Sequence, residues 1–96
     1  MKEPYVALSY LRENKRDMHH VVPRQIAMYL MREVLHFKYE VISSILFRTH
    51  ASAMHGVKTI KNEMEYNKDL RRMVSLEKSL LKESVASSSY YGILED

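Results

Sequence analysis

The sequence predicts an all-α fold, a small multi-helix domain, because apolar residues recur at helical spacing along most of the chain. Glycine and proline are scarce, at two residues each, and no segment shows the alternation of β-branched residues that indicates a strand. A chain of 96 residues can bury one modest core but not two. We therefore expect a single helical domain over residues 1–86, followed by a flexible tail over residues 87–96.

The composition is typical of a folded, soluble protein, with 46% hydrophobic and 28% charged residues. No apolar run approaches the roughly 20 residues that a membrane span requires, and the first residues lack the pattern of a signal peptide. We therefore expect a cytoplasmic protein without a membrane partner. The absence of cysteine excludes disulfides and thiolate metal sites within this sequence.

The charge is distributed unevenly along the chain, although the net value is only +3. Residues 1–62 carry ten Lys/Arg and five Asp/Glu, whereas residues 63–96 carry five and seven. A basic first part and a mildly acidic second part suit a partner rich in phosphate. Ordinary surface charge explains the same counts, so charge alone leaves both readings open.

The first helix is expected to begin near Pro4, because proline is tolerated in the first turn of a helix. Its apolar face would consist of Tyr5, Leu8 and Leu11. Residues 13–20 are polar and carry no apolar stripe, so we expect a loop there.

The second helix is expected to begin at Pro23 and to run to about His36. Its apolar stripe has four-residue spacing and consists of Ile26, Leu30 and Val34. The last helix is expected to begin after Asn67, which can cap it. The stripe of that helix would consist of Leu70, Met73, Leu76, Leu80 and Leu81.

Between these elements the sequence predicts a helix-turn-helix over about residues 39–64. A short helix, Tyr39 to Leu46, is followed by a tight connection at Phe47 and Arg48. Thr49 is a suitable N-cap for a longer helix, His50 to Met64. The major groove of DNA admits one α-helix, and side chains at the leading end of that helix reach the base edges. Many helical hairpins share this pattern, so DNA binding needs further support.

Two stretches supply a resemblance to a known family. The first is Arg-Gln-Ile-Ala-Met-Tyr-Leu at residues 24–30, followed by the basic-acidic pair Arg32-Glu33. The second is Phe-Arg-Thr-His-Ala-Ser-Ala-Met-His-Gly at residues 47–56. Together they resemble characteristic runs of the C-terminal DNA-binding domain of the bacterial replication initiator DnaA. The resemblance covers about residues 14–62 and implies a helix-turn-helix like that of the Trp repressor.

The resemblance implies a set of DNA contacts, position by position. It implies base contacts in the major groove by Thr49, His50 and Ala51. It implies insertion of Arg16 into the minor groove, within a basic arm that also includes Arg12 and Lys15. It implies phosphate contacts by Lys15, Arg24, Gln25, Arg32, Arg48, Ser52 and Lys58.

The sequence departs from the family pattern at four positions. Thr49 replaces an acidic residue that accepts from base amino groups, and Ala51 cannot form hydrogen bonds. Phe47 replaces a glycine of the turn and would be strained if its φ were positive. Gly56 replaces an alanine, which costs about 0.5–1 kcal/mol of helix stability unless close packing offsets it.

These residues predict a sequence-specific binder of double-stranded DNA without ATPase activity. Its role would lie in replication initiation or its regulation, and its location at the nucleoid. No phosphate-cradling glycine-rich loop is present, and His50 and His55 are five residues apart, so we expect no enzyme, metal, cofactor or small-molecule substrate. The alternative is a protein-interaction module, such as a homodimer, that has lost DNA recognition. Phe47, Ala51 and Ala53 would make its leading end less polar.

Overall fold

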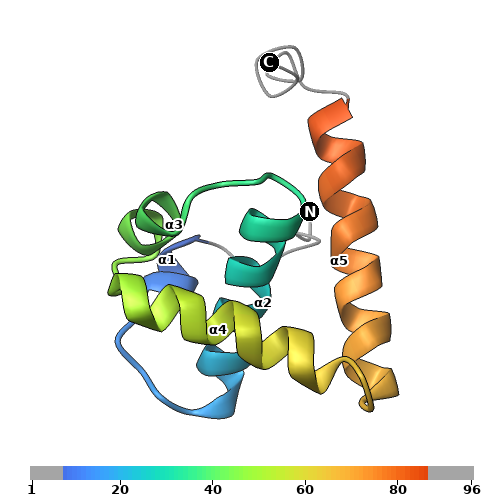
Figure 1. The fold of residues 1–96 in the computed structure, drawn as a ribbon, viewed down its shortest axis with the longest axis horizontal. Helices are drawn as coiled ribbons and strands as arrows, with labels where there is room; N and C mark the ends of the chain where they lie inside the picture. Colours follow the sequence, from blue (N-terminus) through green and yellow to red (C-terminus); the bar gives the residue numbers. More distant parts are fainter. Residues whose placement is uncertain (1–7, 87–96) are drawn as a thin grey trace.

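The computed structural model of the chain describes residues 8–86, and these residues form five helices without a strand (Figure 1). The helices are α1 (Leu8–Arg12), α2 (Met18–Glu33), α3 (Tyr39–Ile45), α4 (His50–Glu63) and α5 (Lys68–Ala86). The predicted all-α fold is confirmed. The predicted helix start at Pro4 and Tyr5, and the predicted tail over 87–96, lie outside the described residues. None of the described helices is long and apolar enough to cross a membrane.

Helix α2 is the centre of the fold (Figure 1). Helix α4 crosses it, α1 and α3 lie near one end of α4, and α5 runs along the opposite side. Buried side chains form two clusters on either side of this crossing. The first lies between all of the first four helices and contains Leu11, Met28, Ile42, Leu46, Ala53 and Val57. The second joins α2, α4 and α5 and contains Ile26, Leu30, Ile60, Leu70 and Val74.

Helix α2 begins at Met18, so the predicted loop ends at residue 17 instead of 20, and the predicted helix start at Pro23 was wrong. The backbone N–H groups of His20 and Val21 donate to the Asp17 carbonyl at 3.0 and 2.9 Å, and these bonds form the first turn. Pro23 lies inside the helix and has no N–H for the carbonyl of His19. The hydroxyl of Tyr10 donates to that carbonyl at 2.6 Å, so a contact from α1 satisfies the acceptor.

The end of α2 also differs from the prediction, at Glu33 instead of about His36. His36 has a φ of 59°, a left-handed conformation that cannot continue a right-handed helix. The N–H of Phe37 then donates to the carbonyl of Met31 at 2.9 Å and closes the helix end.

The predicted helix-turn-helix is present, with α3 ending one residue before the predicted Leu46 and α4 one residue before the predicted Met64. The prediction of Thr49 as N-cap is confirmed, because its Oγ1 accepts from the N–H of Ser52 at 3.1 Å. Phe47 has a φ of 56° in the turn. The strain expected for a phenylalanine at a glycine position is therefore present.

Gly56 is buried where α4 packs against α2, next to the side chains of Gln25 and Met28. A Cβ at this position would overlap the sulfur of Met28, whose side chain is fully buried. The close packing considered as a reason for a glycine inside this helix is therefore present.

Helix α5 begins as predicted, since Asn67 Oδ1 accepts from the N–H of Leu70 at 3.0 Å. Its predicted apolar stripe was partly wrong. Met73 and Leu76 are 48% and 61% exposed, whereas Val74, absent from the prediction, is 2% exposed. Leu70, Val74 and Leu81 follow helical spacing on the face that meets α2, and this face excludes position 76.

Candidate nucleic-acid interface

The leading end of α4 presents a small polar surface. Thr49, His50 and Ala51 are exposed, and Ser52 is half-buried. The ring of His50 lies 5.9 Å from that of Tyr39, measured between centroids, with the planes at 56°. Ala53 is completely buried in the first core cluster, so its assignment to a less polar leading end was wrong.

The segment before α2 lies against the turn of the helix-turn-helix. This segment, residues 13–17, is named the basic loop here because it carries Lys15 and Arg16. Arg48, in the turn, donates from Nη2 to the Glu13 carbonyl at 2.7 Å. The structure therefore places the basic loop beside the start of α4, although 35 residues separate Glu13 from Arg48.

Arg24 holds the same loop from inside the fold. Its Nη2 donates to the carbonyls of Glu13 and Lys15 at 3.0 and 2.8 Å, and its Nε donates to that of Leu11 at 3.2 Å. The residue is only 8% exposed. Burial lowers the pKa of the Arg24 guanidinium, and the positive charge of Arg48 lowers it further. Arg24 thus fixes the course of the loop, and its predicted phosphate contact stays a prediction.

Arg12, like Arg24, makes contacts within the fold. Its Nε donates to the carbonyl of Ile45 at 2.7 Å, and its guanidinium carbon lies 4.1 Å from the ring centroid of Phe47. The contacts join α1 to the end of α3 and cover one side of the strained turn. The Arg12 guanidinium is thus engaged within the fold, unlike the exposed side chains of Lys15 and Arg16, and its place in the basic arm stays a prediction.

The other residues with predicted DNA contacts, including Arg16 for the minor groove, differ in their exposure and in the contacts they make within the fold. Lys58 and Arg16 are exposed. Lys15 is exposed and lies 4.0 Å from the Glu13 carboxylate. Gln25 is half-buried. Arg32 is half-buried, donates to the Phe37 carbonyl at 3.0 Å and lies 4.4 Å from the Tyr39 ring centroid. The DNA contacts of these residues stay predictions.

His20 is a residue that the sequence reading placed in a loop and that the structure buries in α2. It is 8% exposed, and its ring stacks on Tyr10 with centroids 4.1 Å apart. Its two ring nitrogens lie 3.0 Å from carboxylate oxygens of Asp17 and Glu13. The hydrogen bond to His20 lowers the pKa of Asp17. The i, i+3 spacing of Asp17 and His20 could have predicted this contact. It does so only if a helix is placed to begin at residue 18.

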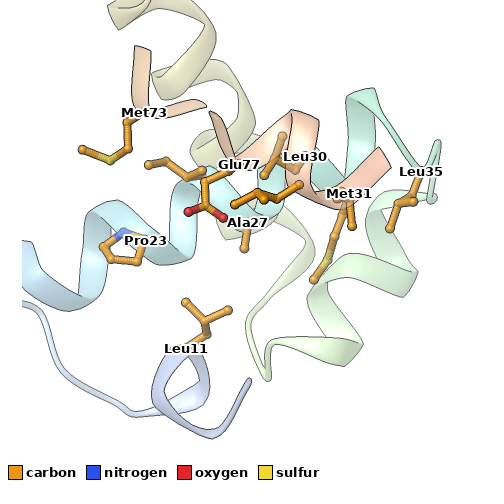
Figure 2. A pocket seen from close by; sticks show the side chains of 11 residues that line it. Leu11, Pro23, Ala27, Leu30, Met31, Leu35, Met73 and Glu77 are labelled. Carbon is orange, nitrogen blue, oxygen red and sulfur yellow. The ribbon is translucent and has the colours of Figure 1, made fainter. Parts of the chain in front are cut away.

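A separate apolar pocket of about 440 Å³ lies between α2 and α5 (Figure 2). Its walls include Pro23, Ala27 and Met31 of α2 and Leu80 of α5. Glu77 points its carboxyl group among these side chains, and burial raises the pKa of this carboxyl. Among residues 8–82 no group of three or more acidic or histidine side chains is arranged to hold a metal ion.

The chain resembles known proteins over the part that carries the basic loop and the helix-turn-helix. It matches the family described as bacterial DnaA protein helix-turn-helix over residues 2–60. It is 32% identical over 71 residues to chromosomal replication initiator protein DnaA 2 of Chlamydia pneumoniae, covering 74% of this chain and 16% of that protein. It is 37% identical over 70 residues to the DnaA protein of Chloroflexus aggregans, covering 72% of this chain and 15% of that protein.

A third relative, the DnaA protein of Caldanaerobacter subterraneus, is 31% identical over 77 residues, which cover 80% of this chain and 17% of that protein. The chain therefore spans about one sixth of the length of these relatives. No solved structure matches it. The matched residues contain the whole of α1 to α3 and most of α4. With the helix-turn-helix geometry in place, these matches show that the chain belongs to the bacterial DnaA helix-turn-helix family.

Proposed function

We propose that this domain binds double-stranded DNA in a sequence-specific manner and acts in replication initiation or its regulation. The observation that carries the proposal is the family match, because it spans the exposed leading end of α4 and the basic loop beside it. In this arrangement α4 enters the major groove, where Thr49, His50 and Ala51 meet base edges. Ala51 contributes through its methyl group, which can pack on a thymine methyl.

The flanking contacts would come from side chains on both sides of α4. Arg16, exposed in the basic loop, reaches the minor groove, and Lys15 and Lys58 approach phosphates as mobile point charges. Gln25 and Ser52 add neutral hydrogen bonds to the backbone. Arg24, Arg32 and Arg48 already donate to carbonyls within the fold. A guanidinium has five N–H donors, so those left over would reach phosphates from fixed positions.

The proposed activity is binding without ATP hydrolysis. The exposed leading end of α4 and the basic loop beside it are suited to binding a polyanion. Neither feature suggests catalysis. We propose double-stranded DNA at the nucleoid as the partner, with no cofactor.

The test is a titration of the full chain against an initiator-box duplex and a mixed-sequence duplex at low salt. We expect tighter binding to one sequence, which selection from a random duplex pool would identify. His50→Ala should weaken that binding by about 1–3 kcal/mol and relax specificity at one base pair. His55→Ala is the matched control, because His55 is exposed on the same helix beyond its leading end. Absence of binding to any duplex would refute the proposal.

A protein-interaction module is the second candidate, and one observation favours it. Val41, Phe47 and Met54 are 42%, 63% and 47% exposed, and all three belong to the helix-turn-helix. Exposed apolar side chains of this size are typical of protein contacts when they form a continuous patch. Sedimentation of the chain over a range of concentrations distinguishes the two candidates, since a dimer that protects His50 from solvent supports interaction and a monomer supports DNA binding.

A further inference from the structure

The ring of His20 lies between two carboxylates that come from the two ends of the basic loop. Nε2 is 3.0 Å from Oε1 of Glu13, the first residue of the loop. Nδ1 is 3.0 and 3.1 Å from the two carboxylate oxygens of Asp17, the last residue of the loop. The buried ring of His20 therefore connects the first residue of the loop, Glu13, to the last, Asp17, four positions further on.

These contacts specify the protonation state that holds the loop closed. A carboxylate only accepts hydrogen bonds, and a neutral imidazole has one N–H donor. Both contacts are hydrogen bonds at once only when both ring nitrogens carry a proton. The charged ring is then held by two charge-assisted bonds, and the stacked ring of Tyr10 covers its face. The lowered pKa of Asp17, caused by its hydrogen bond with His20, is consistent with this state.

Other charged groups around the ring act on the loop rather than on the ring nitrogens. Lys15 lies 4.0 Å from the Glu13 carboxylate. Arg24 and Arg48 donate to the backbone carbonyl of Glu13. The guanidinium groups thus hold the loop backbone, and His20 holds the side chains at its ends. Lys15 and Arg16, in the middle of the loop, remain exposed to solvent.

We propose that His20 is a positioning residue for DNA binding: its doubly protonated ring closes the basic loop and so holds Arg16 at a fixed place relative to the leading end of α4. The inference rests on the proposed function, since the role of Arg16 is part of it. A closed loop lowers the ordering cost that binding would otherwise incur. The expected consequence is that affinity depends on His20, a buried side chain that is not among the proposed DNA contacts.

The first experiment compares His20→Phe with wild type. Phenylalanine keeps a ring for Tyr10 and removes both bonds to the loop. We expect amide hydrogen exchange at residues 14–17 to become faster and affinity for the preferred duplex to fall about tenfold, as loss of one to two net hydrogen bonds implies. His19→Phe is the matched control, because His19 is the exposed neighbour and should change neither readout. Unchanged exchange and affinity in His20→Phe would overturn the proposal.

The second experiment separates positioning from simple electrostatics. Glu13→Ala removes a negative charge next to the proposed DNA surface, so long-range electrostatics alone predicts tighter binding. Positioning predicts weaker binding, because the loop loses one of its two ties to His20. Glu65→Ala, which removes an exposed carboxylate in the turn before α5, is the charge-matched control. Tighter binding by Glu13→Ala than by the control would overturn the proposal.

The third readout is the ring itself, which needs no DNA. Nitrogen NMR of the wild-type ring should show both nitrogens protonated while the loop amides are protected. A neutral ring with a protected loop would overturn the proposal. If wild type binds no duplex, the proposed function fails, whereas exchange and ring signals still decide whether His20 orders the loop.

Discussion

The hydroxyl of Tyr10 donates to the carbonyl of His19, and this is the carbonyl that Pro23 leaves without a helical donor. An N–H at position 23 would otherwise donate to it, four residues back along α2. The contact explains how a proline is accommodated six positions into a helix. It also joins α1 to the first turns of α2, next to the basic loop.

Tyr10→Phe is therefore expected to lower the free energy of unfolding by about 0.5–1 kcal/mol, the net value of one hydrogen bond at a partly solvated site. The aromatic ring, and hence its stacking on His20, is retained. In a Pro23→Ala background the same change should cost almost nothing, because the alanine N–H supplies the missing donor. Urea unfolding of the four variants measures this coupling, and equal costs in both backgrounds would contradict the explanation.

We expect the variant Phe47→Gly to be more stable than the variant Phe47→Ala. Both changes remove the contact with Arg12, but only glycine removes the cost of a left-handed φ at a residue with a Cβ. The difference between Phe47→Gly and Phe47→Ala in unfolding free energy should be about 1 kcal/mol. Ala51→Gly, in the first turn of α4, is the control, and there glycine should be destabilising by up to about 1 kcal/mol. Alanine equal to glycine at position 47 would argue against strain in the turn.

Glu77 predicts a pH-dependent change in stability. Burial raises the pKa of its carboxyl in the folded state above its ordinary value of 4.5, so folding disfavours the charged form. Below the unfolded pKa the carboxyl is protonated in both states and contributes nothing. As pH rises through the folded pKa, the stability falls by the full penalty. Glu77→Gln should therefore be more stable than wild type at pH 7, on the order of 0.5 kcal/mol because the site is partly solvated, and equal to it near pH ~3.

Thermal unfolding of Glu77→Gln at several pH values is the measurement. Glu65→Gln is the control, because Glu65 is exposed in the turn before α5. A stability gain that is the same at acid and neutral pH would indicate packing rather than ionisation.

Lys58 and Lys61 offer a matched pair for the proposed phosphate contacts. Lys58 is exposed, whereas the Lys61 ammonium lies 3.5 Å from a carboxylate oxygen of Glu33. Lys58→Ala should weaken binding to all duplexes and reduce the slope of log affinity against log salt by about one. Lys61→Ala should change the slope less, since its charge is already paired. The measurement is fluorescence titration between low and physiological salt, and an unchanged slope for Lys58→Ala would exclude it from the interface.

The sequence predicted those elements whose signals are local. Thr49 and Asn67 cap helices through hydrogen bonds to residues three positions on, and both caps were predicted. The start of α2 was not, because a proline inside a helix depends on Tyr10, which is 13 residues away. The face of α5 was only partly predicted, because the packing of α2 decides that Val74, and not Leu76, is buried.

The candidate site also has a part that local sequence signals predict and a part that depends on contacts between distant residues. The leading end of α4 follows from the helix-turn-helix pattern and the family resemblance. The partners of Arg12, Arg24 and Arg48 are backbone carbonyls. Every residue has such a carbonyl, so the sequence does not indicate which ones are the partners. His20 belongs to this second kind, since its bonds to Glu13 and Asp17 require the loop to fold back on the helix it precedes.

The close approach at Gly56 has a consequence for altering the DNA target. The reading residues 49–52 and this glycine belong to the same helix, so a helix grafted from a relative brings its own residue to position 56. Any residue with a Cβ there meets the sulfur of Met28 and moves either that side chain or the whole helix. A specificity exchange that keeps Gly56 therefore preserves the depth at which the helix is presented. One that replaces it has to displace the buried side chain of Met28, so the residues at positions 28 and 56 should be chosen together.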